Sequence, residues 1–415
     1  MAANDDTRVK KRRRKPSRPE QLSESAQEER SARSRKKRHT LPRILFRLLL
    51  VAALAVSCLW ISRNFDSLSP ASVSDWLDEK LSGGVRGDGF PMTIDGDAVI
   101  SVGTLGDSLA VLSDNALTIY NKNAGEVARR LHNYAAPAMK LAKKYALVAD
   151  VGGTRITLET RSDTVLEFTA PDSIVTVALA PNGRFAVATG ADKSHTSKVT
   201  VYDRRGNELY SWVSADLMVV DMAFDPTGSR VAVAGVTAKN ADLHSALTIL
   251  NVSGEAPVSY TADRIMLCAT AFLDAQTVAA VGSDVLWVAK ADGSEKTEYA
   301  YDDRELMSFS VGSSLIGLLL RPYGSADGGE LVVLDSTGQP RQCIAFDDTF
   351  RCLSADGDRM LLLTDRELAA YTVEGLQGQV TTSADGRLVT ALNGRPLVVG
   401  LTAVTEYTLQ KSGAQ

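Results

Sequence analysis

Residues that commonly carry catalysis or metal binding occur in this sequence, but their spacing matches neither use. Three of the four histidines, His132, His195 and His244, lie beyond the N-terminal arm, and none belongs to an HxH or HExxH pair. Because two histidines at such spacings can bind one metal ion, the sequence predicts no metal site. It also lacks a GxSxG motif, a phosphate-binding glycine loop and a DxDxDG calcium loop. These absences predict a protein that is not an enzyme and has no cofactor.

Acidic residues leave one enzymatic alternative open. Asp302-Asp303 and Asp347-Asp348 stand at expected turns, where aspartate side chains bond the backbone. A pair of carboxylates lining a channel can instead hydrolyse a glycosidic bond, and one sequence does not show which carboxylates meet in space. An exported hydrolase or lyase with an active site at a channel mouth is therefore the alternative function.

The elements that would position any site follow a repeating pattern of short strands. Residues 174–212 contain four apolar or alternating runs, separated by turns such as Pro181-Asn182-Gly183. Such runs form one antiparallel up-and-down sheet. The pattern recurs at a period of roughly 35–48 residues, which predicts an all-β fold, a β-propeller. Apolar second runs, such as Phe185–Thr189, indicate strands buried on both faces.

The number of repeats predicts eight blades, with seven as the alternative if two weak repeats share one blade. Repeats begin near Gly96, Met139, Ile174, Met218, Met266, Leu306, Phe350 and Arg387. The last repeat supplies only three strands, whereas Phe90–Asp95 forms an unassigned strand before the first repeat. Pairing this strand with the Thr402–Leu409 region would close the ring and protect both sheet edges.

Cysteine spacing indicates neither a disulfide framework nor a zinc site. Cys58 lies in an apolar segment, and Cys268, Cys343 and Cys352 show no CxxC spacing. Cys268 and Cys352 take equivalent positions in two repeats, so we expect them in different blades, unpaired. They are predicted to be small buried apolar residues.

Charge separates a basic arm from an acidic body. Residues 1–43 carry 15 Lys and Arg against 6 Asp and Glu, and the remainder carries 31 against 44. The arm has no apolar periodicity and is predicted to be disordered. The apolar segment that follows favours the anionic inner leaflet of a membrane as the partner of the arm, and no nucleic acid.

Residues 44–62 are predicted to form one transmembrane helix. A stretch of 18 apolar residues with one charge reaches roughly 27 Å, close to the hydrocarbon thickness of about 30 Å. The expected anchor residues are Arg47, Leu48 and Trp60. Basic residues before the span predict a cytoplasmic N-terminus and an extracellular C-terminal domain at the cell membrane. Cleavage as a signal peptide, or lipid attachment at Cys58, are the alternatives.

The linker over residues 63–89 is predicted to contain a short amphipathic helix at 70–81. The sequence SPASVSDWLDEKLSGGVRGDGFPMTI, at residues 69–94, follows a basic arm and one span. In this it resembles an uncharacterised family of single-span, membrane-anchored WD40-like β-propeller proteins of Firmicutes. The resemblance implies a propeller, here residues 90–410 before a tail at 411–415. The function of that family is unknown, so the resemblance implies no catalytic residues.

Propeller geometry predicts which loops face away from the membrane. A closing outer strand begins on the face that carries the first-to-second and third-to-fourth strand turns, so the linker must reach that face. Loops between second and third strands open on the opposite face, and long ones occur at 190–198, 236–245 and 321–330. Long loops on a rigid scaffold commonly carry recognition. The candidate binding rim consists of Lys193, His195, Lys239, Asn240, His244, Arg321 and Tyr323.

Together these patterns predict a membrane-anchored, extracytoplasmic β-propeller in the bacterial cell envelope. It would act as a non-catalytic binding or scaffold module for a protein or cell-wall ligand.

Overall fold

A computed structural model describes residues 85–410, apart from 95–97, 191–194, 241 and 326–327. These residues form 32 strands and no helix. No helix among them is long and apolar enough to span a membrane. The predicted arm, the predicted span at 44–62 with Arg47, Leu48 and Trp60, and the predicted linker helix at 70–81 lie outside the described residues.

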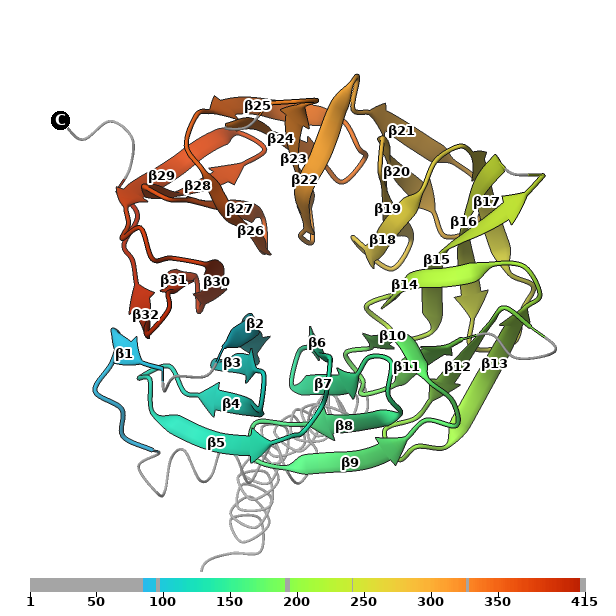
Figure 1. The fold of residues 1–415 in the computed structure, drawn as a ribbon, viewed down its shortest axis with the longest axis horizontal. Helices are drawn as coiled ribbons and strands as arrows, with labels where there is room; N and C mark the ends of the chain where they lie inside the picture. The colour runs from blue at the N-terminus through green and yellow to red at the C-terminus, as the bar shows by residue number, and fades with distance from the viewer. Residues whose placement is uncertain (1–84, 95–97, 191–194, 241, 326–327, 411–415) are drawn as a thin grey trace, which may run out of the picture. The chain divides into compact units, whose positions relative to one another are not determined.

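The strands form eight four-stranded antiparallel sheets arranged as the blades of a ring (Figure 1). Blade 1 contains β2 (Val99–Leu105), β3 (Ser108–Ser113), β4 (Ala116–Tyr120) and β5 (Glu126–Leu131). Blade 2 contains β6 (Pro137–Ala142), β7 (Tyr145–Asp150), β8 (Arg155–Glu159) and β9 (Thr164–Thr169). Blade 3 contains β10 (Ile174–Leu179), β11 (Phe185–Thr189), β12 (Ser197–Tyr202) and β13 (Glu208–Ser214). Blade 4 contains β14 (Met218–Phe224), β15 (Arg230–Lys239), β16 (Asp242–Asn251) and β17 (Val258–Asp263).

The other half of the ring repeats this order. Blade 5 contains β18 (Leu267–Phe272), β19 (Thr277–Gly282), β20 (Val285–Lys290) and β21 (Lys296–Ala300). Blade 6 contains β22 (Arg304–Val311), β23 (Leu315–Pro322), β24 (Gly329–Asp335) and β25 (Pro340–Phe346). Blade 7 contains β26 (Phe350–Asp356), β27 (Arg359–Thr364), β28 (Glu367–Thr372) and β29 (Gly375–Thr381). Blade 8 contains β30 (Leu388–Leu392), β31 (Arg395–Val399), β32 (Ala403–Glu406) and β1 (Met92–Thr93).

Burial explains why each strand has its sequence pattern. The second strands β3, β7, β11 and β19 are buried at every position, because neighbouring blades cover both of their faces. The outer strand β17 alternates between half-buried and exposed positions, as a strand with one solvated face does. The core therefore lies between blades, as where Phe185 and Tyr202 of blade 3 pack on Phe168 of blade 2.

The predicted eight blades and the predicted closing strand are both confirmed. Met92 pairs with Val404 and Thr93 with Ala403, so β1 completes the sheet that the C-terminal strands begin. The Ile94 amide continues this pairing by donating to the Thr402 carbonyl at 2.8 Å. A second clasp was not predicted: Gln410 exchanges backbone hydrogen bonds with Gln379 on the outer strand of blade 7.

The chain that leads into β1 is fastened to one turn of blade 1. The Asn121 side chain donates to the Val85 carbonyl at 2.7 Å, and the Gly89 amide donates to the Asn123 carbonyl at 3.0 Å. A Cβ atom on Gly87 would lie 2.0 Å from the same carbonyl oxygen, so only glycine fits there. This turn joins the third and fourth strands of blade 1, so the lead-in arrives at the expected face, here called the proximal face. The opposite face is called the distal face.

Two expectations need correction. Residues 236–245, expected to be a loop, instead extend β15 and β16 into a long hairpin that pairs as far as Lys239 and Asp242. The backbone N–H and C=O groups around Leu243 pair across the two strands of this hairpin, so the segment forms strands and not a loop. Cys268 and Cys352 lie in different blades and are free, as expected, but both are half-buried instead of fully buried, because they belong to the inner strands that border the central opening.

Candidate binding surfaces

The distal face carries most of the predicted rim, on elements of three blades. Lys239, Asn240 and His244 belong to the β15–β16 hairpin of blade 4, and Asn240 holds its turn with a φ of 52°. His195 lies just before β12 in blade 3. Arg321 and Tyr323 lie at the end of β23 in blade 6, with blade 5 between them and the hairpin. Lys193 lies outside the described residues.

The charged rim residues bind neighbouring protein groups. Lys239 reaches Asp216 at 3.1 Å, in the connection between blades 3 and 4, and His244 Nδ1 lies 2.6 Å from Asp263. Thr237 pairs with His244 and Lys239 pairs with Asp242, so Lys239 and His244 lie on the same face of the hairpin. Ion pairs at such exposed positions contribute little to stability, about 0–1 kcal/mol, so a ligand can exchange them cheaply.

The blade 6 part of the rim reaches toward blade 5. Arg321 Nε donates to Glu305 at 2.7 Å, within its own blade. The Tyr323 ring is 61% exposed, and its hydroxyl lies 3.5 Å from Asp284 in the β19–β20 turn of blade 5. The described rim residues therefore share one face but lie on three separate blades.

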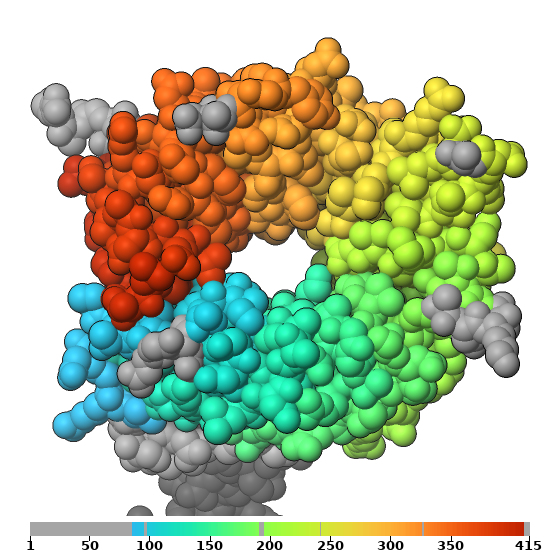
Figure 2. Space-filling view, in the orientation of Figure 1, coloured from blue at the N-terminus to red at the C-terminus, as the bar shows by residue number. Residues whose placement is uncertain are grey.

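The inner strand of each blade borders an opening at the centre of the ring (Figures 1 and 2). Asp221 on β14 is the best-bonded acid there, because its carboxylate accepts from Lys140 on β6 at 3.3 Å and from the Thr270 amide at 3.0 Å. This network links blades 2, 4 and 5. Because Asp221 already binds a lysine and a backbone amide, its role is to hold these blades together. It is therefore a poor candidate for one of two paired catalytic carboxylates.

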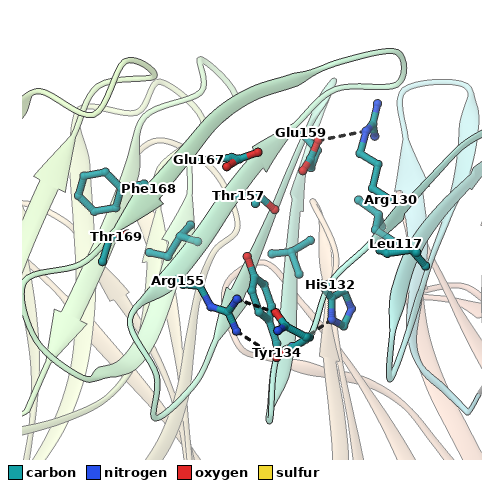
Figure 3. A pocket seen from close by; sticks show the side chains of 14 residues that line it. Leu117, Arg130, His132, Tyr134, Arg155, Thr157, Glu159, Glu167, Phe168 and Thr169 are labelled. Carbon is teal, nitrogen blue, oxygen red and sulfur yellow. Dashed lines mark hydrogen bonds and ion pairs between the residues drawn. The ribbon is translucent and has the colours of Figure 1, made fainter.

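A cleft that was not predicted lies between blades 1 and 2, with a volume of about 380 Å³ (Figure 3). Its blade 2 wall is the β8–β9 face that carries Arg155, Thr157, Glu159 and Glu167. Its blade 1 wall includes Arg130 on β5. Pockets of about 300–1,000 Å³ are typical of small-ligand sites.

The polar wall of the cleft differs from the core between neighbouring blades, which is built from apolar side chains. On the opposite face of the same strands, Ile156, Leu158 and Phe168 join the apolar core shared with blade 3. Polar side chains on the face toward blade 1 contribute no such core. The signal was present in β8, whose sequence RITLE alternates strictly, unlike the third strands ALTIY and LTILN of other blades. It was missed because alternation is also typical of a solvated strand face.

Glu159 is the acid at the closed end of the cleft. Its side chain is 4% exposed, lies 3.3 Å from Arg130 Nε, and accepts from the Thr164 hydroxyl at 2.7 Å. Burial raises the pKa of Glu159 above its ordinary value of 4.5, and the negative charge of Glu167 raises it further. Thr164, Arg130 and Thr157 act in the opposite direction but do not cancel the effect of burial.

The other end of the cleft is built from stacked rings. The Tyr134 ring stacks on His132 with centroids 5.0 Å apart, and the Arg155 guanidinium lies 5.0 Å from the Tyr134 centroid. Arg155 also donates to the side chain and carbonyl of Asn133, at 2.6 and 3.0 Å. Burial lowers the pKa of His132, which therefore favours the neutral imidazole.

No metal site accompanies these groups: in the described part of the chain, no cluster of three or more His, Cys, Asp or Glu side chains could hold a metal ion.

The fold and its surfaces define a WD40-like β-propeller of eight blades. The chain belongs to a family of unknown function, DUF5711, whose sequence model matches residues 93–390. A comparison with curated protein sequences finds no match.

Solved structures show the same fold. BamB from Moraxella catarrhalis is 12% identical with a TM-score of 0.51, and the match covers 76% of this chain and 98% of BamB. The C-terminal WD40 domain of Sif2 is 10% identical with a TM-score of 0.54, and the match covers 79% of this chain and all of that domain. At these identities the likeness establishes the propeller architecture.

Proposed function

We propose that this protein is a membrane-anchored binding module of the bacterial cell envelope. The predicted span at 44–62 would hold it, with the propeller outside the cell and its distal face presented to a protein or cell-wall ligand. Fold likeness to BamB and to a WD40 domain supports a binding module, and the anchor and envelope location rest on the sequence pattern.

The distribution of exposed apolar side chains carries the assignment of the distal face. Twelve large apolar side chains of the described residues are exposed, and eight lie at strand ends or loops of the distal face. Those eight are Ile100, Leu131, Val213, Met218, Leu243, Met266, Tyr323 and Leu401. These side chains are spread around the ring and not joined in one patch, so the support they give is their bias toward the distal face, where a partner that covers the face would contact them. The proximal face receives the lead-in chain instead.

Site-specific crosslinking tests the binding face. A photo-crosslinking residue at Leu243, on the distal hairpin, is compared in whole cells with one at Leu209, which lies near the proximal end of β13; the two side chains are 37% and 41% exposed. We expect crosslinked products from position 243 and none from position 209. Equal products from both positions, or products from 209 alone, would contradict the assignment.

Native Cys343 tests the location without a new residue, because it is exposed on the outer strand of blade 6. A membrane-impermeant maleimide added to intact cells should label the full-length protein, and Cys343→Ser should remove most of that label. Labelling that requires permeabilised cells would overturn the extracellular location while leaving the crosslinking result intact.

A further inference from the structure

We propose that the proximal face of blades 2 and 3 lies against anionic phospholipid headgroups of the membrane that holds the protein. The contact area, here called the basic surface, consists of Lys143, Lys144, Arg184, Arg204 and Arg205. The proposal rests on the membrane anchor proposed above, and it concerns the face opposite to the proposed binding face.

Charge is unevenly distributed over the turns of the proximal face. The four turns of blades 2 and 3 contain six Lys and Arg against two Asp, whereas the corresponding turns of blades 4 and 5 contain five Asp and Glu and no Lys or Arg. These turns are residues 143–144, 160–163, 180–184 and 203–207 in blades 2 and 3, and 225–229, 252–257, 273–276 and 291–295 in blades 4 and 5.

Charged strand ends beside these turns narrow the difference without reversing it. They are Glu159 and Glu208 in blades 2 and 3, and Arg230, Lys290 and Lys296 in blades 4 and 5. With them included, six basic residues stand against four acidic ones in blades 2 and 3, and three against five in blades 4 and 5. The proximal face of an acidic propeller therefore has one sector with a basic excess.

Contacts bring three of the turns together beside the Tyr145 ring. Lys144 Nζ lies 5.4 Å from the centroid of that ring. A Cβ atom on Gly183 would lie 3.1 Å from ring atoms of Tyr145 and 3.4 Å from Cβ of Arg204, so this glycine sits between the two side chains. The other three residues of the basic surface are direct chain neighbours of Lys144, Gly183 and Arg204. The basic residues of blades 2 and 3 thus share one area.

Nearby groups do not neutralise this area. Asp203 is the one acid among the twelve residues of the three turns, and its carboxylate accepts from the backbone amides of Arg205 and Asn207 at 2.8 and 2.9 Å. Glu208, exposed at the start of β13, is the next acid along the chain. Arg184 donates to the Gly228 carbonyl at 2.9 Å, and a neutral carbonyl leaves the guanidinium charge uncompensated.

Lys143 supplies an independent observation. It holds the first position of a two-residue turn with a φ of 51°, and it is exposed. The same position is Gly106 in blade 1, Gly357 in blade 7 and Asn393 in blade 8, residue types that adopt a positive φ at low cost. A lysine costs more in this conformation, so the turn itself gives no reason for it. A contact that uses its charge does.

The place of the basic surface favours a membrane over other anionic partners. The lead-in chain is fastened to the proximal turn of blade 1, which neighbours blade 2 in the ring (Figure 1), and 22 residues separate Val85 from the predicted span. A tether of this kind raises the effective concentration of headgroups at the proximal face, so individually weak contacts suffice. Guanidinium groups bind phosphate oxygens in pairs of hydrogen bonds, and each basic residue near an anionic bilayer adds attraction.

Photo-crosslinking from lipids tests the contact on the full-length protein in vesicles. The probes are phosphatidylglycerol and phosphatidylcholine analogues that carry the same photoreactive group on the headgroup, and peptide mapping by mass spectrometry locates the crosslinks. We expect the phosphatidylglycerol probe to modify peptides with residues 143–144 and 203–207 at least threefold more than the phosphatidylcholine probe does. Added salt should weaken this preference, because it screens the charges. Peptides of the linker should react with both probes and so report the anchor.

Matched variants remove charge from the two faces. Arg204→Gln/Arg205→Gln should lower the phosphatidylglycerol crosslinks of the basic surface at least threefold. Arg264→Gln/Arg366→Gln removes two basic side chains from the distal face, 82% and 76% exposed, and should leave those crosslinks unchanged. Lys143→Asn places a residue that tolerates positive φ in the turn, so it should lower crosslinking without lowering the unfolding temperature.

The linker peptides separate failure of the contact from failure of the anchor. Linker crosslinks without crosslinks on the basic surface would overturn this proposal and leave the anchor intact, whereas no crosslinks at either place would overturn both. Equal yields from the two probes, or an unchanged yield in Arg204→Gln/Arg205→Gln, would also overturn it. Soluble polyphosphate distinguishes a second source of phosphate groups: crosslinks that persist in its presence support a lipid partner, and their complete loss, with linker crosslinks retained, would show a free polyanion instead.

Discussion

At the scale of single residues, burial decides the chemistry of the cleft more than charge pairing does. Glu159 has an arginine at 3.3 Å and a hydroxyl donor at 2.7 Å, yet its pKa is raised. An ion pair lowers the pKa of a carboxyl group, whereas loss of water raises it, and here the loss of water is larger. The same balance keeps His132 neutral.

The raised pKa of Glu159 makes the free energy of unfolding depend on pH in a definite direction. Between the ordinary value of 4.5 and the raised value, the folded protein binds more protons than the unfolded chain. The stabilising contribution of the protonated acid is present below pH 4.5 and is lost as pH rises through the raised value. Glu159→Gln should remove this component, so the stability of the variant minus that of the unaltered protein should rise with pH in that window.

Denaturant unfolding midpoints, measured at a series of pH values above 4.5 for both proteins, check this expectation. Glu208→Gln serves as the control and should follow the unaltered protein at each pH. A stability of Glu159→Gln, relative to that of the unaltered protein, that stays constant or falls as pH rises would contradict the assignment.

At the scale of elements, ring closure depends on a strand of only two paired residues. The sequence could predict it because one strand was missing at the C-terminal end and one was left over at the start. Blade 8 buries Val404 and Leu397 beside Leu109 of blade 1, so the pairing of β1 and β32 is supported by an apolar cluster. The Gln379–Gln410 clasp could not be predicted, because any exposed outer strand offers the same backbone groups.

A disulfide across the closure tests it directly. The Ile94–Thr402 hydrogen bond makes Thr93 and Ala403 a pair without direct hydrogen bonds, where antiparallel Cα atoms approach to about 4.5 Å. The variant Thr93→Cys/Ala403→Cys should form a disulfide on mild oxidation and unfold at a higher temperature. The closed loop of about 310 residues gives an entropic limit of roughly 6 kcal/mol.

Peptide mapping by mass spectrometry identifies that crosslink, and the reduced form of the same variant is the reference for its unfolding temperature. If the two introduced cysteines stay unlinked to each other while other cysteine pairs form, the closure is wrong.

At the scale of the whole molecule, the Asp221 network links the inner strands of blades 2, 4 and 5 along one side of the central opening. Asp221→Ala should destabilise the fold by about 1–3 kcal/mol, because it leaves the buried Thr270 amide without its acceptor. Lys140→Ala should cost less, about 0–1 kcal/mol, since the lysine side chain is 41% exposed.

Urea unfolding of the two single variants and the double variant gives the coupling energy between the two residues. A larger loss for Lys140→Ala than for Asp221→Ala would show that the amide is not the main partner of Asp221.

The sequence by itself determined the strand pattern, the ring closure and the face that receives the lead-in chain. The strand pattern follows from local alternation and turn residues, which neighbours in sequence control. The closure and the receiving face follow from the number and order of the strands, because one strand is missing at the C-terminal end and one is left over at the start. The sequence also placed His244 and Tyr323 in distal segments, although it predicted a loop where β15 and β16 form a hairpin.

Only the tertiary structure decided which polar side chains meet. Arg130 and Glu159 are 29 positions apart and come together because blades 1 and 2 pack face to face. Lys140 and Asp221 meet across an intervening blade. A strand pattern shows that one face is polar, but whether that face meets water or another blade depends on the position of the neighbouring sheet, which long-range packing fixes.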